Sequence, residues 1–189
     1  MLRGGGRWSG LAGSLCLGAV LLYLSHNPSL GSRGSISNYY AQLEKTVDLS
    51  LQVRRERGDV HALAVHRGLG PKTDTTEHYR LIEQAVVQAQ QDTPTDVRRG
   101  GLRLMDAGCG MGAGILYFGR RHNEWVIDGY TIAESQFGFI NKHLMKTMLI
   151  QKGDVWLSSY NEPRREYDAI YAIESLWYSP SLDLTLGLW

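Results

Sequence analysis

The stretch "LMDAGCGMGAG", residues 104–114, decides how this chain folds. Leu104 and Met105 form a short apolar run before Asp106, which is typical of a buried strand. Glycine then occupies four of the next eight positions. A glycine-rich loop lets the backbone approach a ligand closely, because glycine has no Cβ and readily adopts positive φ. We therefore expect a ligand site where this strand ends.

Downstream of residue 102, apolar strands alternate with helical segments. The predicted strands are "LRLMD" (102–106), "EWVIDGYT" (124–131), "MLIQKGD" (148–154) and "YDAIYAIE" (167–174), and the predicted helices are "GILYFGRRH" (114–122) and "AESQFGFINKHLMKT" (133–147). This alternation predicts an α/β fold with a Rossmann-like, doubly wound parallel sheet. Ligands of such sheets bind at the carboxyl ends of the strands. We expect the glycine loop, Thr131, Asp154 and Glu174 at those ends.

The chain divides into three predicted regions: residues 1–36, an apolar segment and linker; residues 37–100, a helical region; and residues 101–189, the Rossmann-like domain. Two helices are predicted in the second region, over 37–58 and after Asp74, which forms a capping box with Glu77. The chain stops at Trp189, soon after the fourth predicted strand. We therefore expect a truncated domain that lacks its C-terminal strands.

The apolar run Leu11–Leu24 follows Arg3 and Arg7. A helix over this run would be about 21 Å long, short of the ~30 Å hydrocarbon core of a membrane. The run is read as a targeting segment or a shallow membrane anchor, with an unstructured start as the alternative. The expected location is intracellular, with membrane or organelle association through Leu11–Leu24.

Composition excludes some classes of function. The formal net charge is +1 and the arginine pairs are scattered, so no basic surface for nucleic acid is predicted. The two cysteines, Cys16 and Cys109, form no disulfide framework and no metal-ligand spacing. We therefore expect no nucleic-acid partner and no metal.

Asp106 discriminates between two ligands of the glycine loop. The spacing Gly108-x-Gly110-x-x-Ala113, with Asp128 further on, also fits a dinucleotide fingerprint. A carboxylate beside a bound pyrophosphate would cost about 1–4 kcal/mol of Coulomb energy. S-adenosylmethionine has no phosphate and carries a sulfonium and an ammonium group, which a carboxylate at the loop's mouth would attract. The residues therefore favour S-adenosylmethionine over NAD.

Several motifs together resemble a known family. "MDAGCGMGAG" looks like motif I of class I S-adenosylmethionine-dependent methyltransferases. "DGYTIAESQ" and "YDAIYAIESLWYSP" are similar to segments of a narrower group, which includes sterol, tocopherol and terpenoid C-methyltransferases and cyclopropane fatty acid synthase-like enzymes. "SNYYAQL" and "HALAVHRGLG" are similar to the upstream Y-Y-D and H-x-G elements of that group. The resemblance covers about residues 37–182 and implies the class I methyltransferase fold.

This chain departs from the group at two places. Ala41 stands where the family usually has aspartate, and Trp177-Tyr178 stands where sterol and tocopherol enzymes have a histidine. Tyrosine at this place is closer to the terpenoid C-methyltransferases.

The resemblance also implies roles for individual residues. The aminoacyl and ribose parts of S-adenosylmethionine would meet Asp106, Gly108, Gly110 and Gly112; the ribose hydroxyls would meet Thr131, Ile132 and Gln136; and adenine would lie between Asp154 and Val155. For Asp154, a structural role in a turn or helix cap is the alternative.

On the acceptor side, the implied catalytic residues are Glu174 and Tyr178. Glu174 would take a proton or stabilise a carbocation, or alternatively form a salt bridge. Tyr178 and Trp177 would line a lipophilic pocket, or alternatively belong to the core. Tyr39 and Tyr40 would close over the cofactor, or alternatively form one face of a helix.

The function expected from the sequence is methyl transfer from S-adenosylmethionine to a small, lipophilic acceptor, such as a sterol, a terpenoid or a quinol-like lipid. The alternative is a truncated, non-catalytic module that binds the cofactor or a partner. An NAD-dependent oxidoreductase is a minor alternative function.

Overall fold

The computed structural model describes residues 33–66, 68, 74–92, 101–179 and 181–189. In this part of the chain four parallel strands form one sheet in the order β3-β2-β1-β4. Their bounds are Arg103–Ala107 (β1), Val126–Thr131 (β2), Val155–Leu157 (β3) and Ala169–Tyr171 (β4). The predicted α/β class with a Rossmann-like, doubly wound parallel sheet is confirmed.

The order of the strands places a topological switch beside β1. The chain runs outward from β1 to β2 and β3, and then crosses back to place β4 on the other side of β1. Loops that leave neighbouring strands in opposite directions open a crevice between them, which is where sheets of this kind bind ligands. The carboxyl ends of β1 and β4 therefore mark the place to look for a site.

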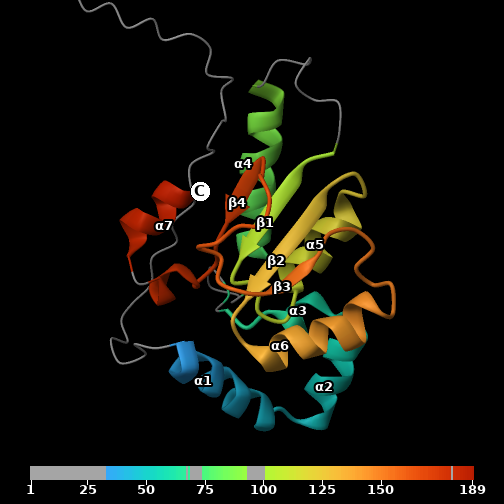
Figure 1. The fold of residues 1–189 in the computed structure, drawn as a ribbon. Helices are drawn as coiled ribbons and strands as arrows, with labels where there is room; N and C mark the ends of the chain where they lie inside the picture. Colours follow the sequence, from blue (N-terminus) through green and yellow to red (C-terminus); the bar gives the residue numbers. More distant parts are fainter. Residues whose placement is uncertain (1–32, 67, 69–73, 93–100, 180) are drawn as a thin grey trace, which may run out of the picture.

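Helices surround the sheet. They are α1 (Arg33–Lys45), α2 (Leu49–Glu56), α3 (Val60–Leu63), α4 (Glu77–Asp92), α5 (Ala113–Arg121), α6 (Glu134–Phe139), the π-helix η2 (Ile140–Met145), the 3₁₀ helix η3 (Leu176–Tyr178) and α7 (Leu182–Leu188). Figure 1 shows α4 running behind the sheet and α1 lying across its lower end, beyond the arrowhead of β2.

Alternating strand residues divide the core into two layers. Leu104 and Ile127 face the helices and pack with residues of α3, α4, α5 and η2. Met105 and Tyr130 point to the opposite face and pack with Tyr160 and other aromatic side chains. Because successive strand residues point to opposite faces, Asp106 belongs to the helix-covered face. That assignment decides what surrounds its carboxyl group.

The predicted helix over 37–58 is two helices. The chain leaves α1 after Lys45, and Asp48 caps α2 by accepting a hydrogen bond from the Leu51 amide at 2.8 Å. Aspartate is favoured at this position because its carboxylate satisfies a free amide of the first turn. In addition, α1 begins at Arg33, inside the stretch predicted to be a linker.

The predicted third strand over 148–154 is wrong. Met148 adopts a positive φ of 59°, and the amides of Leu149 and Ile150 both donate to the Leu144 carbonyl. Leu149 and Ile150 therefore follow the end of η2 and pack against the core, and the strand begins only at Val155. Similarly, β4 ends at Tyr171, three residues before Glu174.

The expectation of a membrane-associated location is corrected. Among the described residues no helix combines the length and apolar character that crossing a membrane requires. The run Leu11–Leu24, on which that expectation depended, lies outside the described residues.

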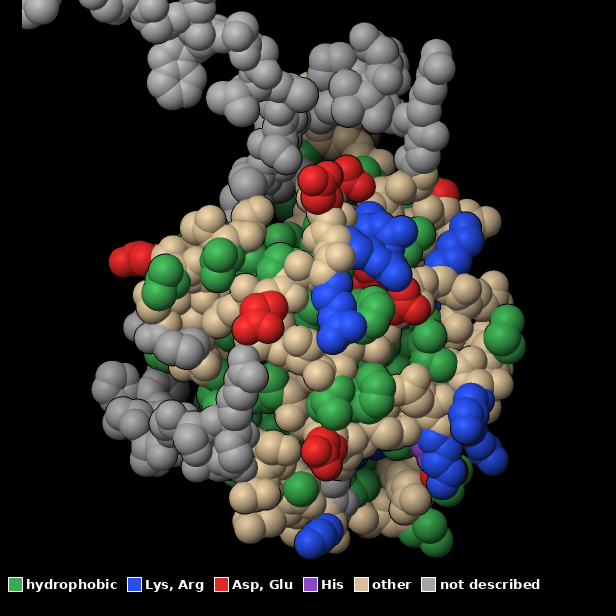
Figure 2. Space-filling model, in the orientation of Figure 1, with side chains coloured by type: hydrophobic (Ala, Val, Ile, Leu, Met, Phe, Trp, Pro, Cys, Tyr) green, Lys and Arg blue, Asp and Glu red, His purple; other side chains and the backbone are tan. Residues whose placement is uncertain are grey.

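On the face drawn in Figure 2, Lys and Arg side chains form separate small groups rather than one stripe.

Candidate functional site

The glycine loop lies at the topological switch, in contact with the segment after β4. Gly108 has a φ of +90°, and a Cβ added to it would lie 2.3 Å from the Cβ of Ser175. Only glycine fits both constraints, the backbone angle and the close approach. Gly110 also has a positive φ, and an added Cβ there would lie 2.7 Å from a methyl group of Val65. The loop is thus enclosed by segments that follow β4 and α3.

Gly112 ends the loop and begins α5. It adopts the left-handed conformation with a φ of 84°, and in the described part of the chain no side chain caps the first amides of the helix. Free amides at a helix N-terminus carry a partial positive charge that suits an acidic group of a ligand. The carboxylate of an amino acid moiety would meet this requirement.

Asp106 is buried rather than placed at the loop's mouth. Its residue is 4 % exposed, and a Cβ on Gly114 would lie 2.7 Å from Asp106 Oδ2. Burial raises the pKa of the Asp106 carboxyl to about 7. The Tyr171 hydroxyl lies beside it and opposes this increase, although the two groups lack standard hydrogen-bond geometry. Direct pairing of Asp106 with a cationic ligand stays a prediction, and the carboxyl lies on the helix-covered face, beside Gly114 of α5.

Beside Asp106, tyrosine and histidine side chains form a row of contacts. Burial, followed by the charge of Asp106, raises the pKa of Tyr79 well above its usual value. The Tyr79 hydroxyl lies 2.8 Å from His66 Nε2. The His66 ring packs edge-on against His78, whose pKa is lowered to about 4 by burial and then by His66. This chain of polar side chains joins the segment after α3 to the floor of the glycine loop.

At the carboxyl end of β2, a threonine and a glutamine that were predicted to meet the ribose are bonded to each other. Thr131 Oγ1 donates to Gln136 Oε1 at 2.8 Å and accepts from the Ala133 amide at 3.2 Å. Ile132, between them, is half-buried. Gln136 is 3 % exposed, and its Nε2 has no hydrogen-bond partner among the described residues. A buried amide without a partner costs free energy, which a ligand hydroxyl could recover.

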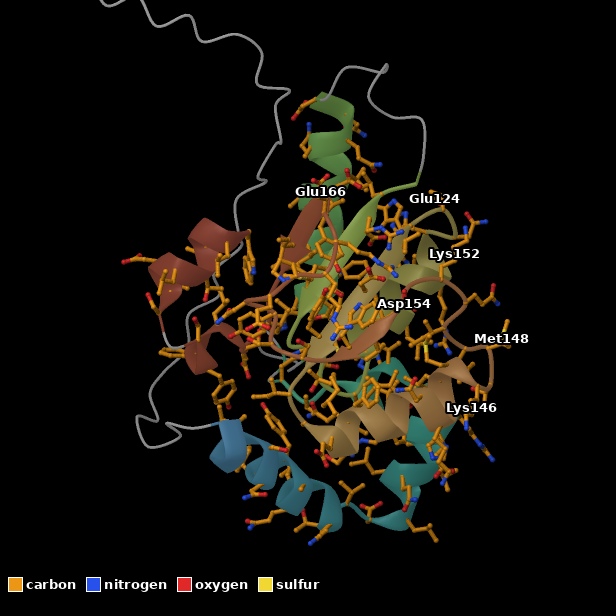
Figure 3. All side chains as sticks on the ribbon, in the orientation of Figure 1. Glu124, Lys146, Met148, Lys152, Asp154 and Glu166 are labelled. Atoms are coloured by element: carbon orange, nitrogen blue, oxygen red, sulfur yellow. The ribbon has the colours of Figure 1, made fainter. Side chains whose placement is uncertain are left out.

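Asp154 and Val155 do not lie where the sequence predicted. They stand at the amino end of β3 and not at its carboxyl end (Figure 3). Asp154 Oδ2 pairs with Arg165 Nη2 at 2.6 Å, and the Asp154 amide donates to Asp128 at 2.8 Å. The misplaced third strand caused this error in position. Asp154 forms an ion pair with Arg165 and caps no helix among the described residues, and its contact with adenine stays a prediction.

Asp128 is fully buried inside β2 and is already paired. Its Oδ2 lies 3.1 Å from Arg103 Nη1 and 3.2 Å from Arg165 Nη1, and it accepts from Tyr167 at 3.2 Å. A ribose-binding acid of a dinucleotide site would instead need a free carboxylate at the end of the strand. This residue therefore does not support the NAD alternative.

Glu174 and Tyr178 lie after β4 on either side of Ser175. Glu174 is half-buried and adopts a positive φ of 51°, which is uncommon for a residue with a side chain. The Tyr178 ring packs edge-on against Tyr40 of α1, with centroids 6.5 Å apart. Burial, then Tyr178 and more weakly Glu174, raise the pKa of Tyr40. The fold thus brings residues from the two ends of the described chain together, while Tyr39 remains 45 % exposed.

Two residues at this place, Ser175 and Tyr160, were not predicted from the sequence. Ser175 donates from Oγ to the Ala107 carbonyl and accepts at its own carbonyl from the Tyr160 hydroxyl at 2.9 Å. No motif marked Tyr160, whose partner is 15 residues away in sequence. Its contact arises only from folding, so no local pattern predicts it.

Comparison with solved structures assigns the fold. The crystal structure of the [4+2]-cyclase SpnF has a TM-score of 0.58 and 21 % identity, over 87 % of this chain and 58 % of that one. Magnesium protoporphyrin IX methyltransferase from Synechocystis PCC 6803, crystallised with S-adenosylmethionine, has a TM-score of 0.52 and 16 % identity. That alignment covers 86 % of this chain and 72 % of the methyltransferase.

The chain has the class I methyltransferase fold. No family model and no curated protein matches its sequence. The class I methyltransferase fold places the glycine loop after β1 at the switch point, which agrees with the geometry described above. At identities this low the likeness concerns the fold, and function has to be argued from the site.

Proposed function

We propose that this protein binds S-adenosylmethionine at the glycine loop and transfers its methyl group to a small, lipophilic acceptor. The observation that carries the proposal is the loop itself. Gly108 and Gly110 bring bare backbone to the carboxyl end of β1, just after the buried Asp106 in the chain. Where it is charged, above its raised pKa of about 7, this carboxyl opposes a pyrophosphate and tolerates a cationic ligand.

The residues present fit this cofactor. The first turn of α5, which no described side chain caps, suits its carboxylate, and the Gln136 amide, without a partner in the described structure, suits a ribose hydroxyl. Bound S-adenosylmethionine supplies an activated methyl group. We assign Asp106 an indirect role, because its carboxyl shapes the floor beneath the loop and sets its charge.

The acceptor would lie on the side of Glu174 and Tyr178. Tyr40 and Tyr178 supply aromatic faces there, beside the half-buried carboxylate of Glu174. Such a site suits an apolar molecule whose reacting carbon becomes cationic when methylated, because aromatic faces and a carboxylate both attract a cation. Glu174 would then accept the proton that leaves the methylated carbon.

Calorimetry on the full chain tests the cofactor. We expect S-adenosylhomocysteine to bind and NAD to bind at least ten times more weakly. Tighter binding of NAD would refute the proposal. Transfer of labelled methyl from S-adenosylmethionine to a panel of sterols, terpenoid diphosphates and quinols then tests the acceptor class.

A cofactor-binding module without methyl transfer is the second candidate. The likeness to a [4+2]-cyclase favours it, because a protein of this fold can serve a different chemistry. This chain spans only 58 % of the length of that cyclase. Whether it has the activity of a complete enzyme of this fold is therefore part of the proposal. Binding of S-adenosylhomocysteine with no labelled product from any acceptor of the panel would favour this candidate.

A further inference from the structure

The carbonyl of Ser175 is held by two donors from different parts of the chain. The Tyr160 hydroxyl donates to it at 2.9 Å, and the Tyr178 amide donates to it at 3.1 Å. Tyr160 belongs to the segment that follows β3, whereas Ser175 follows β4. Both residues are buried, 9 % and 7 % exposed. The phenol of Tyr160 therefore ties two segments that the sheet alone does not connect.

The other side of Ser175 is anchored to the glycine loop. Its Oγ donates to the carbonyl of Ala107, the last residue of β1. Its Cβ occupies the space that a side chain on Gly108 would need. Ser175 is thus anchored at two separate atoms. Its hydroxyl bonds Ala107, on the side of the proposed cofactor, and its carbonyl bonds Tyr160.

The residues on either side of Ser175 depend on this anchoring. Glu174, which precedes it, holds a left-handed backbone conformation that persists only where the surroundings enforce it. Leu176–Tyr178, which follow it, form the single turn η3, for which Ser175 is the N-cap residue. Glu174 and Tyr178 are the two residues proposed to face the acceptor.

Tyr160 is itself well fixed. Its carbonyl accepts a hydrogen bond from Trp189 Nε1 at 3.0 Å, and the two rings pack edge-on with centroids 5.9 Å apart. Burial raises the pKa of Tyr160 to about 12, so its hydroxyl keeps its proton at neutral pH. The side chain is a fixed donor rather than an acid or a base.

We propose that Tyr160 is a positioning residue that holds Glu174 and Tyr178 towards the acceptor by way of the Ser175 carbonyl. This inference rests on the proposed function, because it assigns those two residues to the acceptor side. Tyr160 acts through Ser175, and its hydroxyl is already engaged there. The anchor at Ala107 lies on the opposite side of Ser175, so loss of the phenol hydroxyl should leave the glycine loop in place.

Two measurements on the full-chain Tyr160→Phe variant test the proposal. We expect backbone hydrogen exchange over residues 174–178 to accelerate at least tenfold, with exchange in β1 and β2 unchanged. The affinity for S-adenosylhomocysteine should stay within twofold of the wild type. A merely structural role would instead reduce binding and accelerate exchange across the sheet.

Tyr167→Phe is the matched control. It also removes a phenol hydroxyl from the same face of the sheet, but one that contacts Tyr130 and Asp128 instead of Ser175. Exchange over residues 174–178 should not change in this control. Trp189→Phe is a milder second variant, because it loosens Tyr160 without deleting it, and it should accelerate exchange in the same residues to a smaller extent.

Unchanged exchange over 174–178 in Tyr160→Phe and Trp189→Phe would overturn the proposal, as would equal acceleration in β1 and β2. The proposed function fails separately, if the wild type does not bind S-adenosylhomocysteine. The exchange data would still decide whether Tyr160 holds this segment.

Discussion

At the scale of single residues, a buried acid defines the floor of the site. The pKa of Asp106 is raised to about 7 because burial disfavours its charged form. In the unfolded chain the same carboxyl releases its proton near pH 4. Folding and protonation of this residue are therefore linked.

The linkage gives a pH dependence with a defined sign. Between about pH 4 and pH 7 the folded protein keeps a proton that the unfolded chain has released, so Asp106 makes stability fall as pH rises. The total effect is at most about 4 kcal/mol, from three pKa units at about 1.4 kcal/mol each. Urea unfolding of the wild type and Asp106→Asn, at pH 5 and pH 8, measures the part of it that falls between pH 5 and pH 7. We expect the variant to gain stability relative to the wild type as pH rises.

Comparing the two proteins removes the contribution of other groups. The pKa of His78 is lowered to about 4, and this has the opposite effect on the stability of the protein. The contribution of His78 to stability is lost as the pH falls below about 6.5, where the unfolded chain binds a proton first. That term is common to both proteins and cancels in the difference. A difference between them that does not change with pH would contradict the assignment to Asp106.

Glu174 gives a second prediction at this scale, which depends on the proposed function. With an acceptor found in the panel, Glu174→Gln should reduce turnover about 10²–10⁴-fold, the usual size of a general acid–base contribution. Glutamine keeps the shape of the side chain, so the affinity for S-adenosylhomocysteine should not change. Glu166→Gln, at an exposed position, is the control and should leave both quantities intact (Figure 3). If Glu174→Gln lowers stability but leaves activity per folded molecule unchanged, Glu174 has only a packing role.

At the scale of elements, one carboxylate ties α4 to the end of α5. Glu83 Oε1 lies 2.8 Å from Arg121 Nε and 2.5 Å from His122 Nε2. The His122 ring in turn stacks on Trp125, with centroids 3.7 Å apart. Hydrogen bonds and packing, rather than the apolar stripe of α4 alone, therefore set how these two helices meet.

Glu83→Ala should destabilise the protein by about 1–2 kcal/mol. Hydrogen bonds to charged groups contribute about 1.5–3 kcal/mol, and the value is discounted here because Arg121 is half exposed and keeps its hydration after the change. Chemical denaturation at pH 7 measures the loss. Glu124→Ala is the control, because Glu124 is 55 % exposed and lies 3.6 Å from the other ring nitrogen of His122. Equal losses in both variants would show that Glu83 has no special role.

The last helix shows how context overrides a local pattern. In α7 leucine alternates with other residues at positions 182, 184, 186 and 188, a period that favours a strand. The segment is nevertheless helical, because Ser181 caps it at the Leu184 amide and Thr185 is fully buried and bonded to Asn161. All four leucines are left between 39 % and 69 % exposed as a result. Polar anchors, not apolar burial, hold this element.

At the scale of the whole molecule, the proposed cofactor site connects three strands. The loop after β1, the Thr131–Gln136 pair after β2 and Ser175 after β4 converge at one edge of the sheet. A ligand bound there should stabilise the whole sheet, because it would contact segments that otherwise meet only through strand pairing.

S-adenosylhomocysteine at 100 times its Kd should raise the unfolding free energy by about 2.7 kcal/mol. Hydrogen exchange should slow in β1, β2 and β4 together. Thermal unfolding with increasing ligand, with NAD as the matched control, measures the first effect. Protection confined to the loop after β1 would contradict a site that spans the switch point.

The sequence by itself determined the class of the fold and predicted where the proposed site lies. The alternation of strands and helices and the run from Leu104 to Gly114 are local signals, because strand periodicity and the backbone freedom of glycine act within a few residues. They correctly predicted β1, β2 and the loop between β1 and α5. Parallel topology then follows, since short crossovers permit few alternatives.

Only the tertiary structure decided what surrounds each side chain. Asp106 faces the helices, Asp128 is paired inside the sheet, and Asp154 lies at the wrong end of β3 for its predicted role. The boundary of β3 was mispredicted because Leu149 and Ile150 are as suitable for a helix end as for a strand. Contacts such as Tyr160 with Ser175, or Tyr40 with Tyr178, join residues distant in sequence. No local pattern encodes such contacts, because they depend on how complete elements pack together.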